Sequence, residues 1–319
     1  MYKESQVSIN NMILNKKRID YEYSHPDVYS KSELIKKVFA EVLSTLKKSG
    51  VKRTIFRIKC QLHKEIIFDK EIKYDSSDLS EIHYAYKTEP GNKKVAVYTA
   101  IFGGYDELKE PEYLSPVCDY YIFTDREIPK DSAWKKIDIS SCKELYGMDA
   151  YHKAKYVKIF PNRFFETYDY SIWVDGTTTI VADLYSFIDR LEEKAIGMFD
   201  NPVHDCIYTE ANFLIYYGRV QEDMIRKQIS FYMNEGYPRH NGMFECTVIA
   251  RKHCDKECIF LMEEWWKQIT AFTMRDQISF PFVLWKNNAR DNVIVIGENR
   301  NFNPRLRFDK HTKTQVYKR

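Results

Sequence analysis

The sequence predicts an α/β fold: a mixed, mainly parallel sheet with helices on both faces, preceded by an N-terminal helical appendage. A breaker, Glu-Pro-Gly-Asn at 89–92, divides the chain. After it, short apolar runs alternate with amphipathic segments, as strands and helices do in such sheets. The charge also changes: residues 1–94 carry 19 Lys and Arg and 13 Asp and Glu, net +6, and the remaining 30 and 33 leave residues 95–319 at −3. We therefore predict an appendage at 1–92 and an α/β domain at 93–319.

The appendage has one clear element. Residues 1–30 are polar and aperiodic, which indicates a tail or arm. Residues 30–49 begin with a serine, stop at Gly50 and carry apolar residues at helical spacing, so an amphipathic helix is expected there. Residues 51–90 are charged and mixed, and a further helix and a short strand are one interpretation of them.

The α/β domain begins with a nearly continuous apolar run, typical of a parallel strand buried on both faces. Strands are expected at 94–102, 119–124, 170–174, 195–199, 244–250 and 293–297. Helices are expected near 150–159, 187–193, 210–217, 220–235, 254–269 and 276–285. Ligands of such sheets bind beyond the carboxyl ends of the strands, where Thr99, Asp125, Asp175 and Asp200 are expected to lie.

Composition excludes some functions. A net charge of +3 is too small to indicate a nucleic-acid-binding protein. The 24 tyrosines either pack the core or line a sugar-binding cleft. The sequence lacks a signal peptide, an apolar run of bilayer length and paired cysteine motifs, so a cytoplasmic location is expected. The basic front segment is either a solvated helical face or, through residues 1–92, a peripheral contact with the inner membrane face.

Asp175 is the main candidate for chemistry. It follows an apolar strand and precedes a glycine and three threonines, and oxygen ligands at a strand end suit Mg²⁺ or Mn²⁺. The alternative is that Asp175 caps the next turn. His311 could complete a carboxylate and imidazole site for Mn²⁺, or it could be a solvated residue of a basic tail. Lys310 beside it is a candidate hydrogen-bond donor to the phosphates of a nucleotide.

Further candidates lie on loops and helix starts. Asp276 and Gln277 either cap a helix or hold sugar hydroxyls, because Asp accepts and Gln both donates and accepts hydrogen bonds. Asn241 and Gly242 form either a plain turn or a close backbone approach to a ligand. His204 lies near several acidic residues and is a candidate for acid–base catalysis.

Lys155 lies on the helix before the Asp175 strand, and it either reaches a diphosphate or is solvated. With Thr99 and Asp125, it is expected to contact a bound nucleotide.

Several of these residues belong to stretches that, together and in order, resemble a family of glycosyltransferase-like domains found in plant Golgi proteins and bacterial polysaccharide loci. The stretches are VAVYTAIFGGYDEL (95–108), YYIFTD (120–125), KAKYVKIFPNRFFETYDYSIWVDG (153–176), HDCIYTEA (204–211), HNGMFECTVIARKH (240–253), RDQISFPFVLWK (275–286) and the His311 tail. Residues 1–90 lie outside this resemblance.

The resemblance implies a GT-A-like fold and a UDP-sugar donor, and the order of the stretches is similar to that in glycogenin-type family-eight glycosyltransferases. By that similarity, Asp175 and His311 bind Mn²⁺ or Mg²⁺, and Asn241 and Gly242 face the sugar. Asp276 and Gln277 lie beside the reacting centre. The family-eight pattern has a second aspartate where this chain has Thr177, and a hydroxyl is the weaker ligand.

We therefore expect a glycosyltransferase that moves a sugar from a nucleotide-sugar donor to a glycan or lipid-linked acceptor in cell-surface polysaccharide synthesis. Two alternatives stay open. Thr177 favours a catalytically silent carbohydrate- or nucleotide-binding module. A glycoside hydrolase would require two facing carboxylates about 5–10 Å apart.

Overall fold

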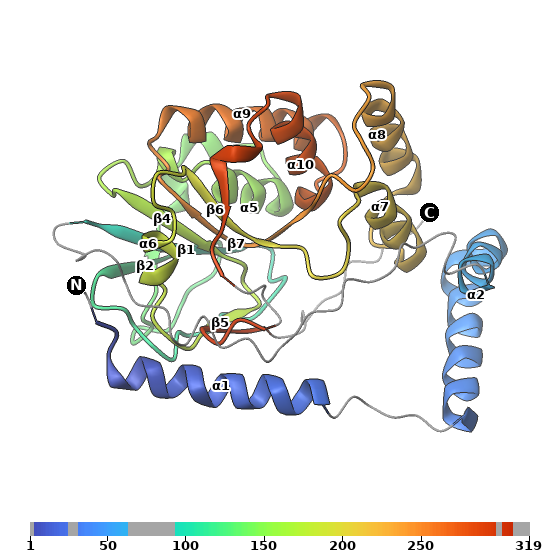
Figure 1. The fold of residues 1–319 in the computed structure, drawn as a ribbon, viewed down its shortest axis with the longest axis horizontal. Coiled ribbons are helices and arrows are strands. Elements are labelled where there is room, and N and C mark those ends of the chain that lie inside the picture. Colours follow the sequence, from blue (N-terminus) through green and yellow to red (C-terminus); the bar gives the residue numbers. More distant parts are fainter. Residues whose placement is uncertain (1–2, 25–30, 63–92, 298–301, 309–319) are drawn as a thin grey trace.

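The computed structural model describes residues 3–24, 31–62, 93–297 and 302–308 (Figure 1). Its centre is a seven-stranded sheet in the order β3-β2-β1-β4-β7-β6-β8. The strands are β1 (Val95–Ile101), β2 (Cys118–Thr124), β3 (Lys135–Ile137), β4 (Tyr170–Val174), β6 (Ile196–Asp200), β7 (Phe244–Arg251) and β8 (Val293–Val295). All neighbouring pairs are parallel except the two that β7 forms. The predicted mixed, mainly parallel α/β sheet is confirmed.

Helices cover both faces of the sheet, because alternate strand residues point to opposite sides. Tyr98 packs into one layer with α5 (Ala150–Ile159), α9 (Lys256–Ala271) and α10 (Asp276–Lys286). Val97 packs into the other with α6 (Tyr185–Asp189) and the antiparallel ribbon of β5 (Thr178–Ile180) and β9 (Leu306–Phe308). The remaining elements are α7 (Ile207–Tyr217), α8 (Glu222–Asn234) and the 3₁₀ turns η1 (Ile139–Ser141), η2 (Lys143–Leu145), η3 (Pro161–Arg163) and η4 (Arg290–Asn292).

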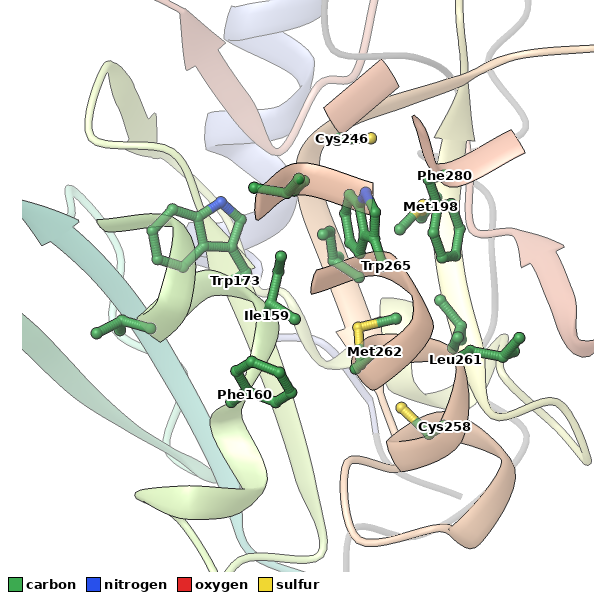
Figure 2. Close-up of a cluster of buried hydrophobic side chains, with 14 of the residues drawn as sticks. Ile159, Phe160, Trp173, Met198, Cys246, Cys258, Leu261, Met262, Trp265 and Phe280 are labelled. Carbon is green, nitrogen blue, oxygen red and sulfur yellow. The ribbon is translucent and has the colours of Figure 1, made fainter. Parts of the chain in front are cut away.

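The first layer fixes the start of α10. Trp265 of α9 is fully buried, and its ring centroid lies 4.5 Å from that of Phe280 on α10 (Figure 2). The indole Nε1 of Trp265 donates a hydrogen bond of 2.9 Å to Ser279 Oγ. Aromatic burial and this hydrogen bond therefore hold the first turn of α10 in one position against α9.

The N-terminal segment corrects one prediction. Residues 1–30 were predicted as a tail, but α1 (Gln6–Ser24) is a helix that lies along the β5–β9 ribbon (Figure 1). Its buried residues follow helical spacing, yet more than half of them are polar: Ser8, Met12, Asn15, Lys16 and Ile19. Because the docking face is polar, the apolar periodicity that would reveal a helix is missing.

Polar contacts attach α1 to the domain. Asn15 Nδ2 donates to the backbone carbonyls of Asn303, Pro304 and Leu306 at 3.5, 3.1 and 2.9 Å. The fully buried guanidinium of Arg305 binds both carboxylate oxygens of Glu4, at 2.6 and 3.0 Å. Such a bidentate, charge-assisted pair fixes both distance and orientation.

Glu4→Gln is expected to lower the free energy of unfolding by about 3 kcal/mol, because it removes the carboxylate that pairs with the buried guanidinium of Arg305. Urea unfolding measures this loss. Glu22→Gln is the matched control: Glu22 lies on α1 and pairs with Arg18 at 2.6 Å, but this pair is open to solvent, with side chains 60 % and 38 % exposed. The control should cost less than about 1 kcal/mol. Equal, small losses in the two variants would contradict the inferred role of the buried pair.

The second N-terminal helix, α2 (Lys31–Leu62), matches the predicted amphipathic helix over its first half. The predicted stop at Gly50 is a break in the helix, with φ 74° and ψ 178°, and helical structure resumes and continues to Leu62. Both α1 and α2 lie outside the central sheet. The predicted boundary at 92/93 falls at the end of residues that the structure does not describe and stays a prediction. Within the described ranges, no helix has the length and apolar character to cross a bilayer.

Candidate active site

A cleft of about 360 Å³ lies beyond the end of β4, between α5, α7 and the start of α10. Five residues that the sequence analysis proposed for the site line it: Lys155, Asp175, His204, Asp276 and Gln277. They come from four separate segments, and the sheet and the helices that cover it bring these segments together. Of the four polar residues that were expected beyond strand ends on the ligand side, Thr99, Asp125, Asp175 and Asp200, Asp175 alone lines this cleft.

Local structure explains how the charged residues arrive there. β4 ends at Val174, so Asp175 is the first residue beyond the strand, where its N–H still bonds to the carbonyl of Thr247 at 2.9 Å. Lys155 and Lys158 are three residues apart on α5 and therefore share one face of that helix. Asp276 is the first residue of α10.

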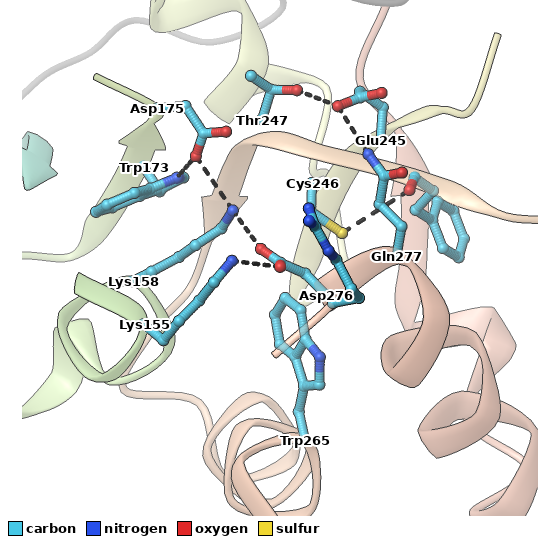
Figure 3. Close-up of polar contacts among 12 residues, drawn as sticks. Lys155, Lys158, Trp173, Asp175, Glu245, Cys246, Thr247, Trp265, Asp276 and Gln277 are labelled. Atoms are coloured by element: carbon cyan, nitrogen blue, oxygen red, sulfur yellow. Dashed lines mark hydrogen bonds and ion pairs between the residues drawn. The ribbon is translucent and has the colours of Figure 1, made fainter. Parts of the chain in front are cut away.

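These four side chains form one ionic cluster (Figure 3). The ammonium of Lys158 lies 2.6 Å from Asp276 Oδ2 and 3.2 Å from Asp175 Oδ1, and Lys155 contacts the other oxygen of Asp276. Trp173 Nε1 donates to Asp175 Oδ1 at 2.6 Å. Lys158 and Asp276 are buried, whereas the Asp175 side chain is about one third exposed. Asp175 is therefore the carboxylate of the cluster that is most open to a ligand.

The cluster holds both buried groups in their charged forms. Burial alone would raise the pKa of Asp276, but the charges of Lys155 and Lys158 outweigh it and keep this pKa well below its usual value. Burial would likewise lower the pKa of Lys158, but Asp175 and Asp276 raise it above its usual value. Asp276 is thus a carboxylate at neutral pH, suited to accept hydrogen bonds and not to donate a proton.

Gln277 belongs to a second hydrogen-bonding network that lines the cleft. Its Nε2 donates to Glu245 Oε1 at 3.0 Å, and its Oε1 accepts from Asn201 Nδ2 at 3.4 Å. Thr247 Oγ1 also donates to Glu245. These partners fix the orientation of the amide of Gln277, as precise recognition of a ligand requires.

His204 forms a pair that suits proton transfer. Its Nδ1 lies 2.7 Å from Glu210 Oε2, and both side chains are buried at the wall of the cleft. The ring packs edge-on against Phe213 at 5.3 Å between centroids. A carboxylate at Nδ1 orients the imidazole and leaves Nε2 as the nitrogen that could exchange a proton with a ligand.

The other predicted residues that the structure describes do not line the cleft. β1 continues two residues past Thr99, so Thr99 lies inside the strand and is buried, and not at its end. Asp125 accepts the N–H of Gly103 at 2.9 Å, which stabilises a tight glycine turn. Asn241 is exposed and donates to Tyr237 Oη at 3.4 Å, and Gly242 beside it has φ 80°. Lys310 and His311 lie outside the described residues.

Two residues of the site were missed by sequence reasoning. Lys158 was not considered, although its spacing of three from Lys155 places it on the same helical face. Glu245 is a buried carboxylate within the fully buried strand β7. A carboxylate within a mostly apolar strand pattern was the signal that could have identified it, because burying such a group requires partners.

Among the described residues, no group of three or more His, Cys, Asp or Glu side chains is placed so that it could hold a metal ion. Asp175 uses Oδ1 for Trp173 and Lys158, so Oδ2 is the oxygen that could face a cation. The donor chemistry of this carboxylate suits Mg²⁺ or Mn²⁺ as one ligand. The predicted approach of Asp175 and His311 stays a prediction.

A family model described as "TOD1/MUCI70, glycosyltransferase-like domain" matches residues 23–303. This chain belongs to that family. The resemblance proposed from the sequence motifs is confirmed, with one correction. The match starts at residue 23 and so includes much of the segment that was placed outside the resemblance. The TOD1/MUCI70 domain therefore reaches into the N-terminal helices.

One curated relative is the probable hexosyltransferase MUCI70 of Arabidopsis thaliana, 26 % identical over 262 residues. The match covers 72 % of this chain and 43 % of that protein, so the chain spans less than half the length of this relative.

Similar solved structures include the bifunctional glycosyltransferase WbbM in its apo form, with 12 % identity and a TM-score of 0.41 over 65 % of this chain and 39 % of that one. Another is mouse xyloside xylosyltransferase 1, also apo, with 8 % identity and a TM-score of 0.38 over 64 % and 84 %. Both TM-scores are below 0.5, so neither similarity supports a conclusion about the function of this chain.

Proposed function

We propose that this TOD1/MUCI70 domain transfers a sugar from a nucleotide-sugar donor, a UDP-sugar, to a glycan or lipid-linked acceptor in cell-surface polysaccharide synthesis. The observation that carries the proposal is the cluster of Lys155, Lys158, Asp175 and Asp276 in a cleft beyond the end of β4. The proposal includes the cytoplasmic location and the peripheral membrane contact expected from the sequence.

The two lysines suit the leaving diphosphate. Lys155 is less buried than Lys158 and lines the cleft, so it is the ammonium that can turn from Asp276 to a phosphate oxygen. Lys158 is held by two carboxylates and supplies a fixed positive charge behind it. Preorganised charge of this kind stabilises the negative charge that develops on a departing diphosphate.

The remaining residues suit the sugar and the acceptor. Asp276 can accept hydrogen bonds from sugar hydroxyls, and the oriented amide of Gln277 can hold a further hydroxyl. His204, oriented by Glu210, can take the proton of the acceptor hydroxyl at Nε2. A Mn²⁺ or Mg²⁺ ion bound by Asp175 and His311 would supply Lewis-acid stabilisation of the diphosphate.

The glycoside hydrolase alternative fits this cleft less well. Asp175 and Asp276 do approach each other, but the ammonium of Lys158 lies between them and binds both. A hydrolase needs the space between its two carboxylates for the glycosidic bond. Asp276 is also unsuited to act as the acid: burial alone would raise its pKa, but the charges of Lys155 and Lys158 outweigh burial and lower it.

Nucleotide release from a panel of UDP- and GDP-sugars, with and without Mn²⁺, tests the proposal. We expect slow hydrolysis of at least one donor by the full chain, faster with Mn²⁺, and its loss in Asp276→Asn. Binding of UDP measured by calorimetry, without hydrolysis or transfer from any donor, would overturn the proposal and favour the silent binding module.

A further inference from the structure

The exposed surface of α2 carries a stripe of large apolar side chains. In its first half the large apolar residues that are exposed form a single stripe at helical spacing: Ile35, Val38, Phe39, Leu43 and Leu46. Phe39 is 66 % exposed and Ile35 68 %. After the break at Gly50, Val51, Ile55 and Ile58 are exposed in the same way. We call these eight residues the α2 stripe.

α2 contacts α7 through residues that follow the break at Gly50. Among the α2 side chains that the structure describes, Thr45 and Thr54 are buried, and Arg57 donates to Thr45 Oγ1 within the helix, across the break. The guanidinium of Arg57 lies 4.8 Å from the centroid of the Tyr216 ring on α7. Phe56 adds a half-buried apolar contact with the helical cluster around α7. The buried side chains described on α2 are thus polar while the α2 stripe is exposed, the reverse of a helix that packs on a core.

The charge of α2 indicates what the stripe contacts. Residues 31–62 contain nine Lys and Arg and two Asp and Glu, a net charge of +7 in a chain whose total is +3. Exposed Lys36, Lys47, Lys52 and Lys59 accompany the stripe. Two copies of α2 packed face to face would bring together two charges of +7, and like charges across an interface oppose association. An apolar face with a strongly basic flank suits an anionic lipid surface.

We propose that α2 docks the protein on an anionic membrane surface, with the α2 stripe in the lipid interface and its lysines at the headgroups. α7 lies between α2 and the cleft: Tyr216 contacts Arg57, while Glu210 and Phe213 line the cleft. Docking through α2 therefore brings the cleft within one helix of the membrane. This placement suits a lipid-linked acceptor. The inference about the acceptor rests on the proposed function, whereas the inference about docking does not.

Flotation with vesicles tests the proposal, using the full chain and either phosphatidylcholine alone or phosphatidylcholine with about one third phosphatidylglycerol. We expect binding to the anionic vesicles alone, weakened by salt. Ile35→Ser with Phe39→Ser, and separately Lys36→Glu with Lys47→Glu, should each weaken binding at least about tenfold. Phe260→Ser on α9 and Lys143→Glu are matched exposed controls and should leave binding unchanged.

Two outcomes would overturn the proposal. One is equal binding of wild type and both α2 variants. The other is that the wild type does not bind anionic vesicles. If light scattering then shows wild-type dimers that Phe39→Ser dissociates, the α2 stripe is a self-association surface instead. Donor hydrolysis in solution does not involve lipid, so it should be the same in all these variants. Failure of membrane docking is therefore distinguishable from failure of the glycosyltransferase proposal.

Discussion

Lys158→Met is expected to abolish sugar transfer and to lower the free energy of unfolding by about 3 kcal/mol, near the lower end for breaking a buried ion pair. Lys158 is buried and binds both Asp175 and Asp276. Methionine has a similar length but no charge, so Asp276 keeps a single cationic partner, Lys155. The cleft would also lose the fixed positive charge proposed to stabilise the leaving diphosphate, and a loss of at least about a thousandfold in turnover is expected.

Two further variants separate charge from packing. Lys153→Met changes the same helix outside the cleft lining and should alter neither stability nor activity appreciably. Lys158→Met combined with Asp276→Asn removes both charges of the buried pair, so it should recover part of the lost stability without recovering activity. Strictly additive losses in this double-mutant cycle would contradict the coupling inferred from the 2.6 Å contact.

The pH dependence of this stability has a defined sign. The pKa of Asp276 is lowered, so its contribution is complete above the unfolded pKa of about 4 and is lost as the pH falls through the folded pKa. The pKa of Lys158 is raised, so its contribution is complete below about 10.4 and is lost as the pH rises through the folded pKa. The difference between wild type and Lys158→Met in urea unfolding should therefore be constant from about pH 5 to about pH 9.

The fold could be predicted where side-chain patterns reflect burial, and not where polar contacts determine structure. The apolar runs of β1 and β4 located both strands. α1 was missed because the polar residues Ser8 and Asn15 lie on the face that docks on the domain. The residues of such a face are expected to be apolar, and that expectation is how a helix is found from its sequence. The direction of β7, antiparallel to β4 and β6, depends on the path of its long connections, which residue patterns do not record.

The site was predictable in part for a similar reason. Asp175 follows a strand and Asp276 begins a helix, so position along the chain alone indicated both. Lys158 was not predicted because lysines are rarely buried, and its charge is compensated only by residues 17 and 118 positions away. A position just after a strand also does not determine whether a side chain points into the cleft. Asp125 follows β2, yet it binds the Gly103 turn and lies outside the cleft lining.

Asp175→Asn is expected to reduce sugar transfer at least about a thousandfold while changing the free energy of unfolding by less than about 1 kcal/mol. The side chain is about one third exposed, and asparagine can still accept the hydrogen bond of Trp173 Nε1. Lys158 keeps its shorter contact with Asp276. The lost charge should therefore affect the bound ligand and its metal ion much more than it affects the fold.

Activity measured over a Mn²⁺ titration, with thermal unfolding of the same samples, checks this expectation for Asp175→Asn. Wild-type transfer should rise with Mn²⁺, and transfer by the variant should stay low at every concentration, because the amide is a weaker ligand than a carboxylate. Asp200→Asn is the control: Asp200 ends β6 but does not line the cleft, and burial raises the pKa of its carboxyl. Transfer should survive in that variant. Full activity of Asp175→Asn would exclude Asp175 from the reaction, and an equal loss in both variants would point to a general requirement for strand-end carboxylates.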